Sequence, residues 1–319
     1  MDYADRFEEH STWPQPENDV RVTRRFDPRQ AALVIALVLL VAVVAIAIAK
    51  SATRSAIYPV EVNGRYGFIN KSGRLVVQPQ FDKAAMFSEG RAPVRSNGKW
   101  GYIDHSGKMV IPAQFDVADP FNDGRAVAGI GPRLGFINKQ GKFVINPQYA
   151  GAGNFGDGLA PVLVGNQWGF INTDGKLVIN PQFQEVGTFS DGLALVKTNG
   201  LYGYIDKSGK LVINPQYNSA GDFNDHLAVV QMGNRWGYID RNGKLAINPQ
   251  FEAASDFSDG LARVEMGNRW GYIDHNGKFV INPQFDDAGN FSAGLAPVWM
   301  GNRGGYINRD GKFVWNPTA

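Results

Sequence analysis

A repeat of 34 residues runs through the chain from residue 57 onward and constrains its fold more than any other feature. Each unit carries a two-residue mark, an aromatic residue followed by Gly, and successive marks lie 34 residues apart without insertion or deletion. The marks are Tyr66-Gly67, Trp100-Gly101, Leu134-Gly135, Trp168-Gly169, Tyr202-Gly203, Trp236-Gly237, Trp270-Gly271 and Gly304-Gly305, where Leu134 and Gly304 replace the aromatic residue. A fixed period of this length indicates stacked structural units.

The same period is typical of tetratricopeptide helix pairs, so helices must be excluded first. Each unit has Pro near its middle, as at Pro181, Pro215 and Pro249, and three or more Gly. Inside a helix Pro costs about 3 kcal/mol and Gly about 1 kcal/mol relative to Ala. The composition of the unit therefore excludes a helix pair and favours short strands joined by turns.

Residues 261–285 illustrate the expected unit, whose three strands are 261–266, 270–273 and 279–281. Gly267-Asn268 forms the first turn, and Asp274 to Gly277 forms the second, with Gly where a positive φ is needed. Pro283 ends the third strand, because Pro cannot donate a ladder hydrogen bond. Residues 286–294 are expected to form a loop or a single helical turn.

The core of each unit is expected to come from positions that hold the same apolar residue in every unit. Ile stands three residues after the start of each mark, and Phe stands 21 after it, from Phe87 to Phe291. We expect Ile273, Val280 and Phe291 to form one layer of a continuous core, and Phe189 to be buried in another. The Gly of the mark should allow a neighbouring backbone or ring to approach closely.

The expected fold is all-β, an array of eight 34-residue three-stranded β-meander repeats. An open solenoid is favoured, since propeller blades have four strands and about 40 to 50 residues. In addition, no strand is donated by one terminus to complete the unit at the other. A closed, propeller-like ring is the alternative.

The segment Ala31 to Ala49 is an uninterrupted apolar run and predicts a transmembrane signal-anchor helix. Four arginines precede it and two basic residues follow it closely, which places residues 1–30 in the cytoplasm and the repeats outside. A cleaved signal peptide ending at Ala47-Ile48-Ala49 is the alternative. We divide the chain into a disordered cytoplasmic tail (1–30), the anchor (31–49), a linker (50–56) and the repeat domain (57–319).

Composition and motifs argue against catalysis and nucleic-acid binding. The net charge is +2 and the chain has no Cys, which excludes thiolate sites. No nucleophile, metal or nucleotide motif is present. His105 and His275 occupy a variable turn position and are expected to be exposed. An acidic row, one residue per unit, is explained by turn chemistry, and a calcium ladder is the less favoured alternative because a second ligand row is missing. The acidic row is Glu89, Asp123, Asp157, Asp191, Asp225 and Asp259.

The unit Trp-Gly-Tyr-Ile-Asp-x-x-Gly-Lys-x-x-Ile-x-Pro-x-Phe resembles the bacterial WG (KWG) repeat, most closely at Trp100, Trp168, Trp236 and Trp270. The resemblance covers residues 57–319. It implies a β-repeat scaffold on bacterial surfaces and provides no catalytic residues. With the predicted anchor, it places the protein in the bacterial inner (cytoplasmic) membrane with an extracytoplasmic repeat domain.

Two rows are candidate binding residues. The first is a basic row immediately before the marks: Arg65, Lys99, Arg133, Arg235, Arg269 and Arg303. Such a row could contact an anionic glycan or an acidic protein, or it could be a solvated turn position. The second consists of the aromatic residues Trp168, Trp236 and Trp270, which could stack on sugars or pack in the core. The prediction is a non-catalytic, membrane-anchored scaffold for a protein or envelope glycan, without cofactor, metal or nucleic acid; a structural spacer or self-associating surface protein is the alternative.

Overall fold

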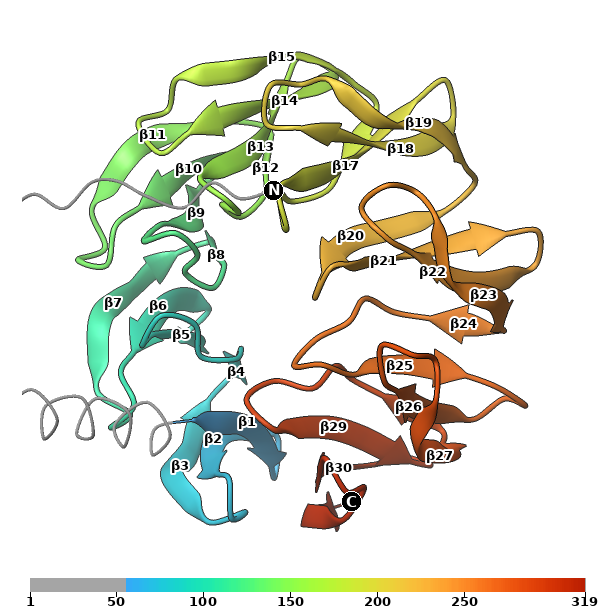
Figure 1. Ribbon diagram of the computed structural model, residues 1–319. Helices are drawn as coiled ribbons and strands as arrows, with labels where there is room; N and C mark the ends of the chain where they lie inside the picture. The colour runs from blue at the N-terminus through green and yellow to red at the C-terminus, as the bar shows by residue number, and fades with distance from the viewer. Residues whose placement is uncertain (1–55, 319) are drawn as a thin grey trace, which may run out of the picture. The chain divides into compact units, whose positions relative to one another are not determined.

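The computed structural model describes residues 56–318, which form an all-β domain of 31 strands in eight sheets (Figure 1). The predicted tail (1–30), anchor (31–49) and linker (50–56, except Ala56) lie outside the described residues. Within residues 56–318, no helix is long and apolar enough to cross a membrane.

We call the sheets blades and number them along the chain. Blade 1 contains β1 (Ile57–Val62), β2 (Arg65–Asn70) and β3 (Leu75–Phe81); blade 2 contains β4 (Lys83–Ala84), β5 (Ala92–Ser96), β6 (Lys99–Ile103) and β7 (Met109–Phe115); blade 3 contains β8 (Val117–Ala118), β9 (Ala126–Ile130), β10 (Arg133–Ile137) and β11 (Phe143–Tyr149). Blade 4 contains β12 (Gly151–Ala152), β13 (Leu159–Val164), β14 (Gln167–Asn172) and β15 (Leu177–Phe183); blade 5 contains β16 (Glu185–Val186), β17 (Leu193–Thr198), β18 (Leu201–Asp206) and β19 (Leu211–Tyr217); blade 6 contains β20 (Ala220–Asn224), β21 (Leu227–Met232), β22 (Arg235–Ile239) and β23 (Leu245–Phe251). Blade 7 contains β24 (Ala253–Ala254), β25 (Ala262–Glu265), β26 (Trp270–Ile273) and β27 (Phe279–Phe285); blade 8 contains β28 (Asp287–Ala288), β29 (Leu295–Met300), β30 (Arg303–Asn308) and β31 (Phe313–Thr318).

Blades 2 to 8 have four antiparallel strands in sequence order, which we call the short, first long, marked and outer strands. The expected three-stranded unit is therefore incomplete, and the segment 286–294, predicted as a loop or a single helical turn, is a loop apart from the two-residue strand β28. In blade 8 the short strand β28 pairs with β29 through Asp287–Trp299 and Ala288–Val298. A two-residue strand is too short to show an alternating pattern in the sequence, which is why it was missed.

The blades form a closed ring in which blade 8 lies beside blade 1 (Figure 1), so the favoured open solenoid is wrong and the alternative, an eight-bladed propeller, is correct. Tyr58 and Val60 of blade 1 share a core cluster with Leu295 and Tyr306 of blade 8. The Tyr306 hydroxyl donates a hydrogen bond to the Pro59 carbonyl at 2.8 Å. Side-chain packing closes the ring, so a strand donated by the opposite terminus is not required.

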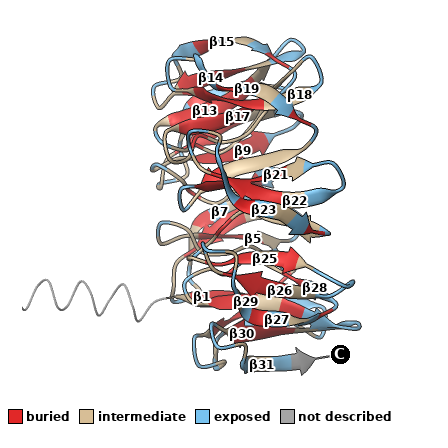
Figure 2. Ribbon diagram, turned by 45° about the vertical axis from the view of Figure 1, so that its right-hand side comes forward, coloured by how far each residue is buried: buried red, intermediate tan, exposed pale blue. Residues whose placement is uncertain are grey.

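The hydrophobic core consists of layers between neighbouring blades, and Figure 2 shows the buried residues along the strands with exposed residues at the turns. Between blades 6 and 7, Tyr238 packs with Phe257 and Ile273. The expected burial of Ile273, Phe291 and Phe189 is confirmed. The expectation for Val280 is wrong: its side chain is 49% exposed, and the adjacent Ile281 is buried instead. Successive strand residues face opposite sides, and the sequence offers two apolar residues in a row.

The outer strand continues through the Pro that was expected to end it. β27 runs from Phe279 to Phe285 and includes Pro283, which is tolerated because an outer strand has a free edge. The pairing shifts register between Trp270–Phe285 and Tyr272–Ile281. At this irregularity a Cβ on Gly271 would lie 2.6 Å from the Ile281 carbonyl oxygen, which confirms the expected close backbone approach at the mark.

Candidate ligand-binding site

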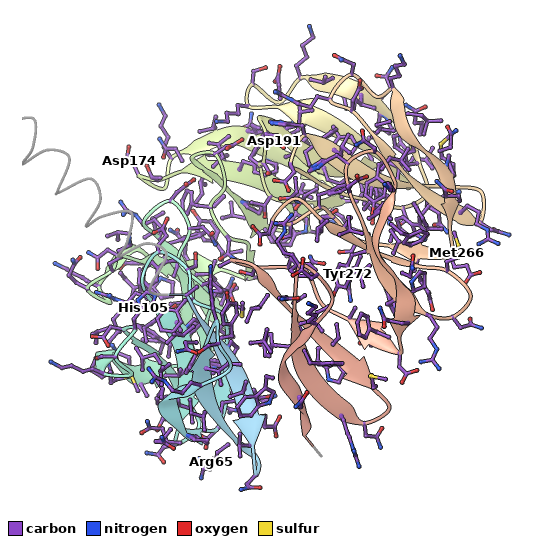
Figure 3. All side chains as sticks on the ribbon, turned by 60° about the horizontal axis from the view of Figure 1, so that its bottom comes forward. Arg65, His105, Asp174, Asp191, Met266 and Tyr272 are labelled. Carbon is purple, nitrogen blue, oxygen red and sulfur yellow. The ribbon has the colours of Figure 1, made fainter. Side chains whose placement is uncertain are left out.

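The basic row lies at the start of the marked strands, with Arg65 at the rim of blade 1 (Figure 3). Four of its six members form ion pairs with carboxylates 17 residues later: Arg65–Asp82, Lys99–Asp116 at 2.5 Å, Arg235–Glu252 at 3.5 Å and Arg269–Asp286. Arg133 donates instead to the carbonyl of Gln148 at 3.3 Å. Within residues 56–318, Arg303 forms no ion pair.

These carboxylates also hold the next blade in place. Asp116 accepts a hydrogen bond from the Gly131 backbone N–H at 2.9 Å, in the turn that follows the first long strand of blade 3. The hydrogen bond from Lys99 is the largest cause that holds the pKa of Asp116 below its usual value. Because a carboxylate lies beside most of the cations, their fields largely cancel at the surface. A binding role for the row remains a prediction.

The candidate stacking aromatics Trp168, Trp236 and Trp270 are half-buried between blades. The Trp168 ring lies over the short strand β12 of its own blade, since a Cβ on Gly151 would lie 2.9 Å from the ring. The Arg263 guanidinium carbon lies 4.8 Å from the centre of the Trp270 ring. These rings already have protein partners, so packing accounts for them, and stacking on a ligand remains a prediction.

The acidic row links successive blades. In six successive pairs, from blade 2 to blade 8, the carboxylate accepts the backbone N–H found 35 residues later, as Asp157 does from Gly192 at 2.7 Å. The acidic residues have positive φ, such as 50° at Asp157, which Asp tolerates in turns. Residues 56–318 contain no group of three His, Cys, Asp or Glu suited to a metal ion.

The two histidines at the variable turn position each stack on a Phe side chain. His105 stacks on Phe87 at 4.3 Å between ring centres, and His275 stacks on Phe257 at 4.4 Å. Burial lowers the pKa of His105 below its usual value.

A cavity of about 520 Å³ lies where blade 8 meets blade 1, within the usual size range of ligand sites. Its walls come from the first long strands β1 and β29, the marked strands β2 and β30, and the outer strand β31. Its lining includes Pro59, Val60, Glu61, Tyr66, Trp299 and Trp315.

The cavity exists because the repeat pattern is broken on both sides of it. Blade 1 has no short strand within the described residues. In blade 8, Gly304 stands where other marks have a large side chain, and Trp299 from the adjacent strand covers it: a Cβ on Gly304 would lie 3.0 Å from the indole nitrogen. The lining mixes aromatic surface with backbone polar groups, which suits recognition of an extended or flat ligand.

Glu61 is the one ionisable group besides tyrosines among the described residues that line the cavity. Burial, and then the hydrogen bond with Glu61, raise the pKa of Tyr66 above its usual value. Burial is also the main cause that raises the pKa of Tyr306. Both phenols are therefore neutral hydrogen-bond donors over the physiological range.

Sequence reasoning did not find this cavity, although signals for it were present. Gly304 interrupts the mark, and Tyr58 stands where every later unit has Ala. These two irregular positions lie at opposite ends of the repeat domain in the sequence. Their proximity therefore becomes visible only in the closed ring.

Comparison with solved structures supports the fold. The chain is similar to the dihydro-heme d1 dehydrogenase NirN in complex with DHE (12% identity, TM-score 0.56, covering 83% of this chain and 74% of that one). It is also similar to a eukaryotic initiation factor (13% identity, TM-score 0.52, covering 83% and 85%) and to apo AztD from Citrobacter koseri (11% identity, TM-score 0.51, covering 82% and 93%). At these identities the likeness concerns the fold alone. No curated protein matches the sequence.

The family model described as "WG containing repeat" matches seven consecutive segments: residues 66–100, 100–131, 135–168, 168–202, 202–236, 236–270 and 270–303. These segments cover most of the described ring. The resemblance inferred from the marks is thereby confirmed, and the chain belongs to the WG-repeat family.

Proposed function

We propose that this protein is a non-catalytic binding scaffold, anchored in the inner membrane, whose ligand occupies the cavity between blades 8 and 1. The observation that carries the proposal is the position of that cavity. The other interfaces repeat one packing arrangement, whereas this interface departs from it and leaves space lined by Trp299, Trp315 and Tyr66. Ligand pockets are concave and lined largely by apolar and aromatic side chains, and aromatic residues are also enriched among the residues that dominate protein–protein binding.

The absence of catalysis is part of the proposal. It is supported by the cavity chemistry, since Glu61 has no cationic or imidazole neighbour among the lining residues. The carboxylates of the acidic row are also poor candidates for catalytic groups, because they accept backbone hydrogen bonds from the next blade.

The ligand class we propose for the cavity is an envelope protein or an envelope glycan; an anionic glycan would contact the basic row, since Glu61 is the charged residue of the cavity lining. The test is capture from envelope extract, with peptidoglycan sedimentation in parallel, by full-length protein in detergent. Trp299→Ala should abolish capture, because it removes one aromatic wall. Gln231→Ala is the matched control at the equivalent position of blade 6, and it should capture normally. Equal capture by both variants would contradict a ligand in this cavity.

The same assay tests the basic row. Replacing Arg235, Arg269 and Arg303 by Gln should leave folding intact, because exposed charges contribute little to stability. If the row contacts an anionic component, capture is lost and wild-type capture weakens as salt rises. Unchanged capture would mean that these residues do not contact the ligand.

The extracytoplasmic location is supported by the sequence of the segment Ala31 to Ala49 and by the arginines before it. A reporter that is active only outside the cytoplasm, fused after Ala319, should be active. Activity of a cytoplasm-specific reporter at the same site would reverse the orientation. Concentration-dependent light scattering of the purified protein would distinguish the alternative of a self-associating surface protein.

A further inference from the structure

Among residues 56–318, the inner edge of β1 lacks the partner that every other first long strand has. In blade 2, the backbone N–H groups of Asp82 and Ala85 donate to the carbonyls of Arg95 and Pro93, at 2.9 and 3.0 Å. The corresponding bonds in blade 8 end on the Trp299 and Pro297 carbonyls, at 3.0 and 2.8 Å. Within the described residues, β1 is the edge of its sheet and pairs only with β2.

The backbone groups of Glu61 point toward this open edge. Val62 and Arg65 close a two-residue hairpin, so Val62, Val60 and Tyr58 are the residues that bond to β2. The alternate residues Pro59 and Glu61 therefore direct their backbone groups away from β2. The Pro59 carbonyl accepts the Tyr306 hydroxyl, and the Glu61 N–H and C=O remain at the cavity.

One half of the missing short-strand position is filled by Tyr58. At the other interfaces a Phe that lies in or after the short strand packs on an aromatic residue of the preceding blade, as Phe291 does on Tyr272 with ring centres 4.7 Å apart. At the closure Tyr58 takes this role, with its ring 5.7 Å from that of Tyr306 and its hydroxyl donating to the Ala293 carbonyl at 2.7 Å. The half opposite Val60 and Glu61 is not filled by any residue of the described part of the chain.

We propose that this open half binds an extended peptide segment of another protein, which adds to β1 as a short fourth strand. The inference rests on the proposed function and specifies its ligand. Unpaired backbone groups at a strand edge are satisfied best by another backbone, which is the basis of β-strand addition. A glycan has no regular row of alternating donors and acceptors to match them.

The ring itself indicates which side chains such a peptide carries. The short-strand residue opposite the equivalent of Val60 is small in each other blade: Ala84, Ala118, Ala152, Val186, Ala220, Ala254 and Ala288. Val60 therefore requires Ala or a residue of similar size. Opposite Glu61 we infer Lys or Arg, since opposite charges in a cross-strand pair attract. Blade 5 shows such a pair at this position, Glu185 and Lys197, at 2.7 Å.

The test measures fluorescence polarisation of a labelled, capped peptide Asp-Lys-Ala-Ala, which copies residues 82–85, against full-length protein in detergent. The charge-reversed peptide Asp-Glu-Ala-Ala should bind about tenfold more weakly, from the loss of an attractive pair and the gain of a repulsive one. The peptide Asp-Lys-Trp-Ala should not bind, because its bulky residue faces Val60.

Variants of Glu61 separate charge from backbone. Glu61→Gln should weaken binding of the Lys-containing peptide and should not weaken binding of the Glu-containing peptide. Glu61→Pro should abolish binding of both, because it removes the N–H that faces the cavity; Pro59 shows that β1 accepts Pro at the alternate positions. The matched control Glu265→Gln, at the equivalent position of blade 7, should bind as wild type. Circular dichroism checks that each variant is folded.

Equal binding of all three peptides, or wild-type binding by the Glu61 variants, would overturn the inference. Loss of the peptide signal together with Trp299-dependent capture of peptidoglycan would identify a glycan as the occupant and leave the proposed function intact. A third possible occupant of the open edge of β1 is a segment of this chain itself. Because the chain has no Cys, rapid disulfide formation between Ala49→Cys and Glu61→Cys, without peptide binding, would identify them. Capture that does not depend on Trp299 would instead contradict the proposed function.

Discussion

Asp222 and Asp256 occupy equivalent positions after or within the short strands of neighbouring blades, where blades 4 and 8 have Asn154 and Asn290. Each carboxylate has one buried oxygen without a hydrogen-bond partner in the described structure. Burial raises the pKa of Asp222 to about 6. Burial, and then the charge of Asp222, raise the pKa of Asp256 to about 7.

These raised pKa values make stability depend on pH. A raised pKa means that the folded protein binds the proton more tightly than the unfolded chain does, so stability falls as pH rises from about 4 to about 7. Asp256→Asn should therefore raise the melting temperature above pH 7 and leave it nearly unchanged near pH 4. Melting curves between pH 4 and 9 test this, and a difference that does not depend on pH would contradict it.

Phe189 should be among the most costly core residues to truncate. Its side chain is 1% exposed and packs edge-on against Phe170, with ring centres 4.9 Å apart. Phe189→Ala should lower the free energy of unfolding by about 3 to 5 kcal/mol, measured by denaturant titration. Val178→Ala, at a side chain 46% exposed in blade 4, is the control and should change it little. Similar losses in both would refute the core assignment.

At the level of single residues, the positions that are the same in every unit could be predicted and the ambiguous ones could not. Phe189 and Ile273 recur at one place in the unit, and only burial between blades explains that. Val280 and Ile281 are adjacent apolar residues on opposite faces of one strand, so the sequence pattern alone does not decide which is buried. The binding role of Trp168, Trp236 and Trp270 is likewise not readable from the sequence, because the same rings serve packing.

Among the strand elements, the Gly of the mark tolerates little change because backbone atoms lie close to it. A Cβ on Gly237 would lie 2.6 Å from the Ile247 carbonyl oxygen and 2.8 Å from the Pro249 nitrogen. Both are backbone atoms of the outer strand β23, which cannot move without losing its register. Gly237→Ala should therefore destabilise the protein by about 3 kcal/mol, the upper end of the range for overpacking.

The control for this prediction separates contact from backbone strain. Gly131 has φ of 65° and nothing within 4 Å of its virtual Cβ, so Gly131→Ala should cost only about 1 kcal/mol. Denaturant titration of both variants gives the comparison. If Gly131→Ala proved as costly as Gly237→Ala, the close approach of the outer strand would not be the reason for the mark.

The long strands could be predicted because turns with Gly and Asp separate apolar runs at constant spacing. The short strands could not, since β24 and β28 have two residues each. The outer strands were predicted too short because Pro was taken as a stop. Pro283 is instead accommodated at a free edge, where its missing N–H costs no ladder bond.

For the whole molecule, repetition predicts how each blade meets the next but not how the last meets the first. Six successive blade pairs are linked by a carboxylate of the acidic row, whereas blade 8 has Ala293 at that position. The closing interface depends on residues that break the repeat, Tyr58 above all. An open array was the natural prediction because those residues look like defects when each unit is read alone.

Tyr58→Ala therefore tests closure directly. The substitution restores the Ala found at this position in the other seven units, but it leaves a cavity against Tyr306 and removes the hydrogen bond to the Ala293 carbonyl. We expect hydrogen exchange to accelerate in blades 1 and 8, while blades 4 and 5, on the opposite side of the ring in Figure 1, stay protected. Tyr58→Phe keeps the ring and loses only the hydroxyl, so its effect should be smaller, about 1 kcal/mol.

The pattern of exchange distinguishes two kinds of ring. If closure is one further interface among eight, the loss of Tyr58 opens that interface and the remaining blades keep their neighbours, as in a linear repeat array. If every blade depends on the ring being closed, exchange accelerates in all blades together. The second result would show that Tyr58 stabilises the whole domain through the closing interface.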